Sequence, residues 1–261
     1  MERFKQKLQQ AGIPFRENEP LAAHCTFKIG GPAQLFVQPQ TEQQLCSAVA
    51  LCKEQAVRYY LLGNGSNILF ADEGFAGVVI DISALGSDIA VEGNMLTAGA
   101  GVRLAALCRA ALEHGLSGLE FAYGIPGTVG GAVYMNAGAY GGEMKDVLTV
   151  VRYLTAEGEV VQASAAELDL SYRHSIFEEN GGCILSAQFA LQPGNAADIR
   201  AKMDELMAKR VDKQPLDKPS AGSTFKRPAG AFAAALIDQC GLRGFRHGGA
   251  AVSDKHCGFV V

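Results

Sequence analysis

Residues 124–142 read Gly-Ile-Pro-Gly-Thr-Val-Gly-Gly-Ala-Val-Tyr-Met-Asn-Ala-Gly-Ala-Tyr-Gly-Gly, and seven of these nineteen residues are glycine. So much glycine disfavours a stable helix or strand, so the sequence predicts irregular backbone here. Small residues let a backbone approach a large flat or extended ligand closely. Because Ile, Val, Met and Tyr alternate with the glycines, we expect this segment to be buried against something rather than to form a flexible surface loop.

A second glycine cluster, Gly63-Asn64-Gly65-Ser66-Asn67, separates two apolar runs, residues 59–62 and 68–70, that we expect to be strands. Successive backbone N–H groups in a glycine-rich turn can bind an anion, and Ser and Asn side chains add hydrogen bonds to phosphate oxygens. A tight hairpin turn explains the same residues. No G-x-G-x-x-G opens a helix here and no G-x-x-x-x-G-K-S/T occurs, so any nucleotide site is of another kind.

The remaining chain mixes helical and strand patterns without regular alternation, which favours an α+β fold over a doubly wound sheet. Apolar residues at helical spacing predict helices at residues 1–10, 41–55, 102–114, 196–211 and 231–240. Further strands are expected at residues 78–82, 147–155, 159–162 and 184–191, at Val252 and at residues 258–261.

Bulk properties bound the class of protein. A chain of 261 residues can hold two modest domains, and no stretch approaches the roughly 20 apolar residues of a membrane span. The first ten residues lack the apolar core of a signal peptide, so we expect a cytoplasmic protein without membrane insertion. Seven scattered cysteines show no metal-ligand spacing, which indicates reduced thiols and no metal site.

Charge is divided unevenly along the chain. Residues 1–198 carry a net charge of −9, whereas residues 199–261 carry a net charge of +5. An acidic body with a basic last quarter indicates an anionic ligand bound by that quarter, although a chance excess on solvated faces explains the charges equally simply. Nucleic acid is not expected as a partner, because the basic residues do not form a stripe interleaved with aromatic residues.

Several motifs together resemble the UDP-N-acetylenolpyruvoylglucosamine reductases of peptidoglycan synthesis. The resemblance begins at Thr26-Phe27-Lys28-Ile29-Gly30-Gly31-Pro32-Ala33 and runs through both glycine clusters. It continues in Tyr172-Arg173-His174-Ser175-Ile176-Phe177, in Ser220-Ala221-Gly222-Ser223-Thr224-Phe225-Lys226 and in residues 248–261. The short run from Phe177 to Ala187 resembles the subgroup that lacks an inserted Tyr-bearing loop.

This resemblance implies a two-part FAD-binding region of the vanillyl-alcohol-oxidase type at residues 1–194, with lobes at about 1–83 and 84–194. A smaller α+β substrate-binding domain would follow at residues 195–261. In the family, a hydride passes from NADPH to noncovalently bound FAD and then to the enolpyruvyl group of a nucleotide sugar. The resemblance therefore implies an NADPH-dependent oxidoreductase that makes UDP-N-acetylmuramate, and we expect a monomer.

Two residues match the family's catalytic positions. Arg173 would hold the substrate carboxylate and stabilise the negative charge that hydride attack builds next to it, because a guanidinium stays charged and can bind bidentately. Ser223 would protonate the resulting intermediate, which requires a cationic or hydrogen-bonding neighbourhood such as Lys226 provides. By the same resemblance, FAD would contact Gly63, Asn64, Gly65, Ser66, Asn67, Ile68, Gly127, Thr128, Val129, Gly130, Asn136, Ala137, Gly138 and Arg210. Substrate would contact Tyr140, Tyr172, Lys213, Lys226, Arg227 and Lys255.

His256 and the pair His24-Cys25 attract other interpretations. His256 could act as an acid–base group, but a structural role is expected. His24-Cys25 could suggest covalent flavin attachment, whereas the resemblance implies a noncovalent cofactor.

The sequence stops at Val261 on the apolar run Gly-Phe-Val-Val, which we expect to be a strand that something should cover. In the family, a C-terminal extension follows this strand and carries a catalytic glutamate. Asp238 and Asp254 lie in the wrong motifs for that role, so we expect a C-terminally truncated chain that binds FAD but turns over poorly. Two rival interpretations stay open at this point, a truncated flavin-binding remnant and a related FAD-dependent oxidase of sugars or alcohols.

Overall fold

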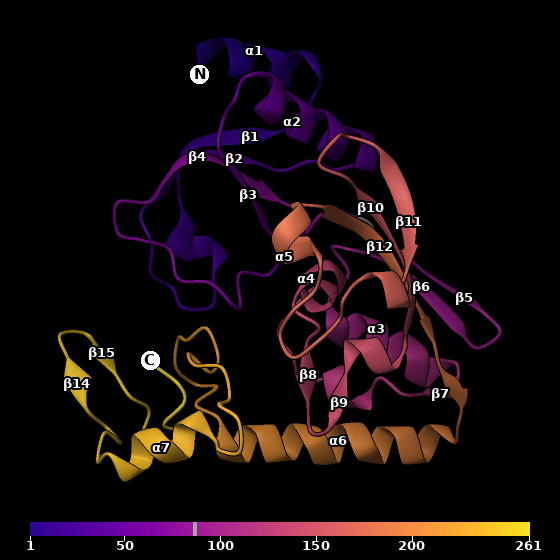
Figure 1. The fold of residues 1–261 in the computed structure, drawn as a ribbon, viewed down its shortest axis with the longest axis vertical. Coiled ribbons are helices and arrows are strands. Elements are labelled where there is room, and N and C mark those ends of the chain that lie inside the picture. Colours follow the sequence, from indigo (N-terminus) through magenta and orange to yellow (C-terminus); the bar gives the residue numbers. More distant parts are fainter. Residues whose placement is uncertain (86–87) are drawn as a thin grey trace.

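The first part of the chain forms a four-stranded sheet. The computed structural model describes residues 1–85 and 88–261 and places its first strands in the order β1-β2-β4-β3 (Figure 1). Strands β2, β3 and β4 run parallel, and β1 pairs antiparallel with β2. The Thr41 hydroxyl accepts a hydrogen bond from the Gln44 amide and so caps α2. The elements of this part are α1 (Glu2–Gln10), β1 (Phe15–Pro20), β2 (Pro32–Val37), α2 (Glu42–Glu54), β3 (Tyr59–Leu62) and β4 (Phe75–Asp81).

The second part forms a five-stranded antiparallel sheet in the order β11-β10-β12-β6-β5. Its core is continuous with that of the first sheet, because Val78 and Ile80 of β4 belong to the same apolar cluster as Leu96 and Phe189. A salt bridge between Glu42 of α2 and Arg152 of the second sheet also connects the first part of the chain to the second. The main elements are β5 (Ile89–Glu92), β6 (Met95–Gly99), α3 (Leu104–Glu113), β10 (Leu148–Leu154), β11 (Val160–Ser164) and β12 (Cys183–Ala190).

Short elements lie between and after the long ones along the chain. The short helices and strands are β7 (Leu116–Ser117), α4 (Val129–Tyr134), β8 (Gly138–Ala139), β9 (Gly142–Glu143), α5 (Phe177–Asn180) and β13 (Gln192–Pro193). Single turns of 3-10 helix cover Leu21–His24, Glu120–Ala122, Met144–Asp146 and Ala165–Glu167.

A long helix carries the chain to its C-terminal part. Helix α6 (Ala196–Lys213) runs beneath α3 and the β8–β9 loop in Figure 1, so the residues that follow it lie below the first sheet. Asn195 caps this helix by accepting from the Ala197 amide at 2.8 Å, and Ile199, Met203 and Leu206 form its buried face. The C-terminal part, residues 214–261, contains α7 (Ala233–Gln239), β14 (Arg246–His247) and β15 (Ala250–Ala251).

The expected helices are confirmed, and three expectations are wrong in detail. The glycine-rich segment contains the short helix α4, which begins where the Thr128 hydroxyl accepts from the Gly131 amide. A Cβ on Gly130 would lie 2.9 Å from the Ala100 Cβ, so glycine lets this helix pack tightly against the chain after β6. Residues 68–70 form no strand, and Val252 and Val260 share only an isolated bridge instead of extended strands.

Candidate active site

The Gly63–Asn67 loop follows β3 and presents unpaired backbone amides. In the described part of the chain, no acceptor is found for the N–H groups of residues 64–68. The side-chain amide of Asn64 donates to Pro126 O at 2.7 Å, and a Cβ on Gly63 would lie 2.7 Å from the Thr128 hydroxyl oxygen. The two glycine-rich segments therefore lie against each other. Five successive free amides in a turn form a concavity suited to phosphate oxygens.

Gly65 allows this loop to lie on the segment that follows β1. Its φ is +61°, and a Cβ here would be 2.1 Å from His24 O. Any other residue would both strain the backbone and push the loop away from its support. His24 is occupied in turn, because its Nε2 lies 2.7 Å from a Glu19 carboxylate oxygen and its ring stacks on Phe36. Nε2 of His24 is thus engaged by Glu19, and the Cys25 side chain is buried.

The predicted residues of the second glycine-rich segment differ in what they can offer a ligand. The Val129 and Gly130 amides donate to Val102 O and Ala100 O at 2.8 and 2.9 Å, so they are already used within the protein. Asn136 is fully buried, and its side-chain amide donates to Glu143 Oε2 and to Ser171 O. Asn136 Oδ1 accepts from the Lys145 amide. This side chain therefore holds the protein's own loops, and a contact of residue 136 with FAD stays a prediction for its backbone.

Arg173 is fixed by the same segment. One guanidinium nitrogen donates to Gly138 O at 2.8 Å, and the guanidinium carbon lies 5.2 Å from the centre of the Tyr172 ring. The φ of Arg173 is +55°, an uncommon value, and Arg173 lies in a turn closed by two backbone hydrogen bonds between Ser171 and His174. The Tyr172 hydroxyl accepts from the Arg227 amide at 3.2 Å. Tyr172 and Arg173, which belong to one motif, are thus joined to Arg227 of the C-terminal part.

Ser223 is held from two sides. It forms a β-bridge with Phe259, and the next amide, Thr224 N, donates to Gly258 O at 2.8 Å. Three residues earlier, Ser220 is hydrogen-bonded to Thr26 of the first part, both through its amide and through its carbonyl oxygen. The Ser223 side chain is exposed, and its hydroxyl has no partner among the residues that the structure describes. It is therefore free to donate a proton to a bound molecule.

Basic residues gather around the C-terminal end of α6. Arg210 lies over the second glycine-rich segment, where a Cβ on Gly124 would be 2.8 Å from its Cδ. Burial lowers the pKa of its guanidinium and nearby Tyr140 opposes this, and no acceptor for it is seen in residues 1–85 and 88–261. The Lys255 ammonium donates to Val211 O, next to the exposed Lys213. A desolvated, unpaired guanidinium beside a glycine-rich segment fits an anionic or carbonyl-bearing ligand.

The side chains of His256 and Asp238 and the carbonyl oxygen of Asp254 are all bound within the C-terminal part. The His256 ring packs edge-on against Phe259, its Nδ1 accepts from the Gly258 amide, and burial lowers its pKa, which together describe a structural histidine. Asp238 is bound by Arg243. Asp254 O also accepts from Arg243.

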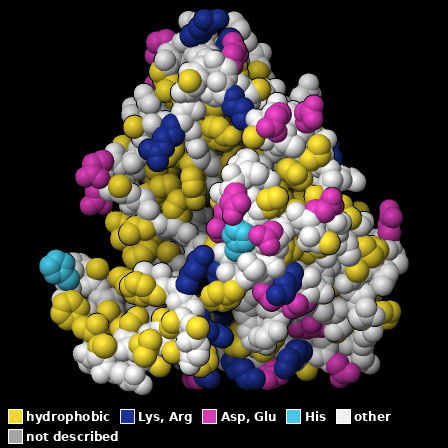
Figure 2. Space-filling model, in the orientation of Figure 1, with side chains coloured by type: hydrophobic (Ala, Val, Ile, Leu, Met, Phe, Trp, Pro, Cys, Tyr) yellow, Lys and Arg dark blue, Asp and Glu magenta, His cyan; other side chains and the backbone are white. Residues whose placement is uncertain are grey.

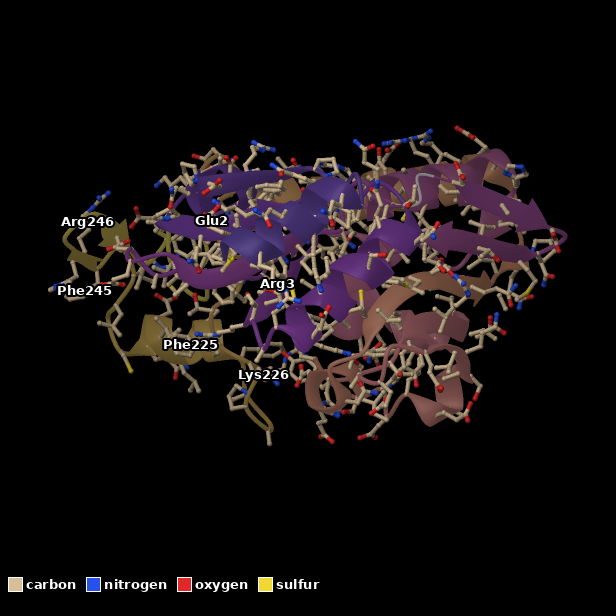
Figure 3. All side chains as sticks on the ribbon, turned by 90° about the horizontal axis from the view of Figure 1, so that it is seen from above. Glu2, Arg3, Phe225, Lys226, Phe245 and Arg246 are labelled. Atoms are coloured by element: carbon tan, nitrogen blue, oxygen red, sulfur yellow. The ribbon has the colours of Figure 1, made fainter. Side chains whose placement is uncertain are left out.

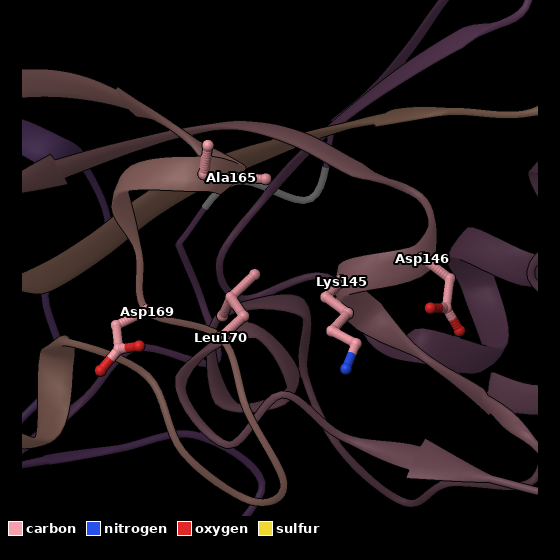
Figure 4. Close-up of a pocket in the computed structure, with 6 residues that line it drawn as sticks. Lys145, Asp146, Ala165, Asp169 and Leu170 are labelled. Atoms are coloured by element: carbon pink, nitrogen blue, oxygen red, sulfur yellow. The ribbon is translucent and has the colours of Figure 1, made fainter.

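One face of the molecule carries both hydrophobic and basic side chains. Figure 2 shows hydrophobic side chains over both of these regions, with basic side chains near the middle of the face between them. A separate hollow appears in Figure 4 beside Lys145 and Asp169. No predicted site residue lines it, but Lys145 N contacts Asn136, and Asp169 lies 3.3 Å from His174. Through these two contacts the hollow lies near the loop that carries Arg173.

Two residues of this arrangement were missed at the sequence level. The sequence shows Thr26 only as part of a motif and gives no signal that distinguishes Glu143. Thr26 follows a 3-10 turn and Glu143 begins a capping box with Asp146, so each looks like an ordinary turn residue in the sequence. Only the fold reveals that Thr26 touches Ser220 and that Glu143 touches Asn136.

Comparison with known proteins identifies the class. A family model described as an FAD binding domain matches residues 33–164. The solved structure titled "Physcomitrella patens BBE-like 1 variant D396N" shares the fold with a TM-score of 0.54 at 20% identity, over 72% of this chain and 44% of that one. The chain is a FAD-dependent oxidoreductase with an α+β fold, as the sequence predicted.

Closer relatives identify the family. Residues 214–261 match the model of the UDP-N-acetylenolpyruvoylglucosamine reductase C-terminal domain. Reductases of this name from Clostridioides difficile and Agathobacter rectalis are 48% and 50% identical, over 94% and 98% of this chain and 80% and 84% of their own lengths. The crystal structure of the reductase from Thermus caldophilus superimposes with a TM-score of 0.81 at 34% identity, over 95% of this chain and 87% of that one. The chain belongs to the UDP-N-acetylenolpyruvoylglucosamine reductase family.

Proposed function

We propose that this protein uses NADPH to reduce UDP-N-acetylglucosamine enolpyruvate to UDP-N-acetylmuramate, a step of peptidoglycan precursor synthesis. FAD, when bound, supplies the hydride transfer between NADPH and the enolpyruvyl double bond. We further propose a cytoplasmic monomer with the FAD-binding region at residues 1–194 and the substrate-binding domain at residues 195–261. Each helix in the described part of the chain is too short or too polar to cross a bilayer.

The unpaired amides of residues 64–68 support a role in binding the diphosphate of FAD. They are the donors of this region that the protein itself leaves free, whereas the Val129 and Gly130 amides are occupied. The Arg210 guanidinium, desolvated over Gly124, would face a polar edge of the flavin. Gly127, Thr128, Ala137 and Gly138 would contribute close backbone contact.

The observation that carries the function is the placement of Arg173. Its guanidinium is fixed by Gly138 O and by the Tyr172 ring, so it is oriented before substrate arrives. Hydride addition to the enolpyruvyl double bond places negative charge next to a carboxylate, and a preorganised guanidinium stabilises that charge without reorganisation cost. Ser223 then donates its hydroxyl proton to the carbon, and Lys226 and the neighbouring basic residues lower the cost of its alkoxide.

Substrate contacts follow from the residues around this pair. The Tyr172 hydroxyl accepts a hydrogen bond from the Arg227 amide, and the side chains of Tyr140, Lys213, Lys226 and Lys255 are exposed. The excess of positive charge in residues 199–261 complements a nucleotide diphosphate and a carboxylate.

The test follows NADPH oxidation by the flavin-loaded protein with and without the enolpyruvyl nucleotide sugar. Arg173→Ala is expected to lower kcat about 10²–10³-fold, as for removal of one preorganised charge-stabilising donor, while flavin bleaching by NADPH alone is retained. Arg246→Ala, an exposed arginine on β14, is the control and should leave kcat unchanged. A steady-state rate of NADPH oxidation that is the same with and without the enolpyruvyl sugar, or flavin bleaching by a sugar alcohol without NADPH, would contradict the proposal and favour an oxidase.

A further inference from the structure

We propose that Thr26 is a positioning residue that sets the location of Ser223 relative to residues 63–67, called here the flavin-binding loop. This inference rests on the proposed function. Thr26 touches both segments at once. Its amide donates to Gly65 O at 3.0 Å, which ties it to the loop of free amides. Its carbonyl oxygen accepts from the Ser220 amide at 3.2 Å, and its hydroxyl donates to Ser220 O at 2.6 Å.

Thr26 can serve as a reference point because its own segment is rigid. Cys25 is buried, and its thiol donates to Ile29 O across the turn that Lys28 closes with its amide on Cys25 O. Gly65 lies so close to His24 O and to the Cys25 Cα that the flavin-binding loop cannot move toward them. Displacement of this segment would therefore displace the flavin-binding loop as well.

The C-terminal part depends on such contacts for its placement. Helix α7 has no buried residue, and Phe225 and Phe232, which flank the stretch before it, are 59% and 61% exposed. Apolar burial therefore does little to orient the Ser223 segment against the first sheet, and hydrogen bonds to Thr26 and Tyr172 take that role.

The position of the Ser223 hydroxyl matters because a proton donor must come within hydrogen-bond reach of the reacting carbon. A misplacement of about 1 Å can cost on the order of 10²-fold in rate. Ser220 is three residues from Ser223, and the bridge to Phe259 fixes Ser223 only within its own part of the chain. The Thr26–Ser220 contact thus connects the flavin-binding loop through hydrogen bonds to the segment that carries the predicted proton donor.

The first variant is Thr26→Val, which keeps the shape and both backbone hydrogen bonds but removes the hydroxyl donor from Ser220 O. We expect kcat for the enolpyruvyl sugar to fall roughly 10–100-fold, the scale expected for a misplaced catalytic group. FAD content and the rate of flavin reduction by NADPH should stay unchanged. Thr26→Ser should restore kcat, because it restores the donor. Thr149→Val is the matched control, since the Thr149 hydroxyl also donates to a backbone oxygen, that of Gln188, within the second sheet.

Two further readouts separate positioning from a general structural role. The solvent deuterium isotope effect on kcat should rise in Thr26→Val, because a badly placed hydroxyl makes proton donation slower than hydride transfer. The double variant Thr26→Val/Ser223→Ala should be no slower than Ser223→Ala alone, because residues that act through one another are non-additive.

The outcomes are distinct. A wild-type protein that binds FAD but does not reduce the enolpyruvyl sugar refutes the proposed function. In an active wild type, equal kcat values and isotope effects for Thr26→Val and Thr149→Val overturn the role of Thr26. Loss of FAD from both Thr26→Val and Thr26→Ala overturns it as well, because the residue would then act on the flavin-binding loop and not on Ser223.

Discussion

Helix α3 of the second part buries Leu104, Leu107, Cys108, Ala111 and Leu112, whereas helix α7 of the C-terminal part has no buried residue. The contrast extends beyond these helices. One apolar cluster runs through both sheets, but Phe232 and Phe245 of the C-terminal part are 61% and 55% exposed. Figure 3 shows Phe245 and Arg246 at the outer edge of this part, whereas Phe225 and Lys226 lie nearer to the rest of the molecule.

The difference shows that the two regions are specified by different forces. The two sheets hold each other through burial of apolar side chains, which is strong but carries little directional information. The C-terminal part is oriented by a few directional hydrogen bonds, from Thr26 to Ser220 and from Arg227 to Tyr172. The proposed site lies where these regions meet, so its geometry depends on contacts that contribute little to overall stability.

The largest expected effect comes from a phenylalanine substitution in the core. Phe189 lies on β12, is fully buried and belongs to the cluster shared by the two sheets. Phe189→Ala should lower the free energy of unfolding by about 3–5 kcal/mol, through lost burial and a residual cavity. Urea denaturation followed by far-UV circular dichroism measures this change.

Phe245→Ala is the matched substitution in the C-terminal part. Because this ring is mostly exposed, the change should stay within about 0.5 kcal/mol. A loss at Phe245 comparable to that at Phe189 would contradict the comparison, since it would show that the C-terminal part has an apolar core of its own.

A pair of glycines gives the next largest effect. Gly65 and Gly93 both have φ of +61°, but a Cβ at Gly65 would meet His24 O at 2.1 Å, whereas nothing lies within 4 Å of a Cβ at Gly93. Gly93→Ala should lower the free energy of unfolding only by the cost of holding alanine in the left-handed backbone conformation, about 1–2 kcal/mol. Gly65→Ala should cost more and should also weaken FAD binding, because the loop of free amides must shift away from His24. Urea denaturation and FAD titration of the apoprotein separate the two contributions.

Equal stability losses for these two alanine variants, with unchanged FAD affinity, would mean that the loop can move without affecting the cofactor. A loss of FAD affinity in both variants would also contradict this expectation, because Gly93 lies in a turn between β5 and β6 and not in the loop of free amides.

The same contrast explains how much the sequence could predict. Helices such as α2 and α6 follow from local patterns, because Thr41 and Asn195 cap them and apolar residues repeat at helical spacing. Arg173 and Ser223 were predicted by resemblance; the structure places them beside Gly138 and Phe259, and their roles stay predictions. The contact of Thr26 with Ser220 could not be predicted, because 194 residues separate the two and neither pattern nor propensity encodes such a pair.

The glycine-rich segment is a case in which the local sequence pattern predicted the wrong backbone conformation. Its glycine content predicted irregular backbone, yet Val129–Tyr134 is helical. The tertiary environment supplies what propensity lacks, since the Val129 and Gly130 amides donate to Val102 O and Ala100 O and the Thr128 hydroxyl caps the first turn. Packing against the second sheet therefore overrides a weak intrinsic preference.

The smallest expected effects come from two carboxylate–arginine pairs, one in each region. Arg152 donates to Glu42 across 110 residues of sequence, and Arg243 donates to Asp238 across five. In each case the hydrogen bond from the guanidinium lowers the pKa of the carboxyl group. A lowered folded-state pKa gives stability that is present above the unfolded pKa and lost as pH falls through the folded one.

Glu42→Gln should therefore lower the free energy of unfolding at neutral pH by roughly 0.5–1 kcal/mol, a small value because both side chains are more than a third exposed. The difference from wild type should vanish below the folded-state pKa of Glu42, itself below the unfolded value of about 4.3. Asp238→Asn should leave the global urea midpoint unchanged and should accelerate amide hydrogen exchange in α7 alone, because this pair links only neighbouring segments. If Asp238→Asn shifts the midpoint as much as Glu42→Gln, the C-terminal part unfolds together with the sheets, and hydrogen bonds at Thr26 and Tyr172 couple the regions more strongly than their burial indicates.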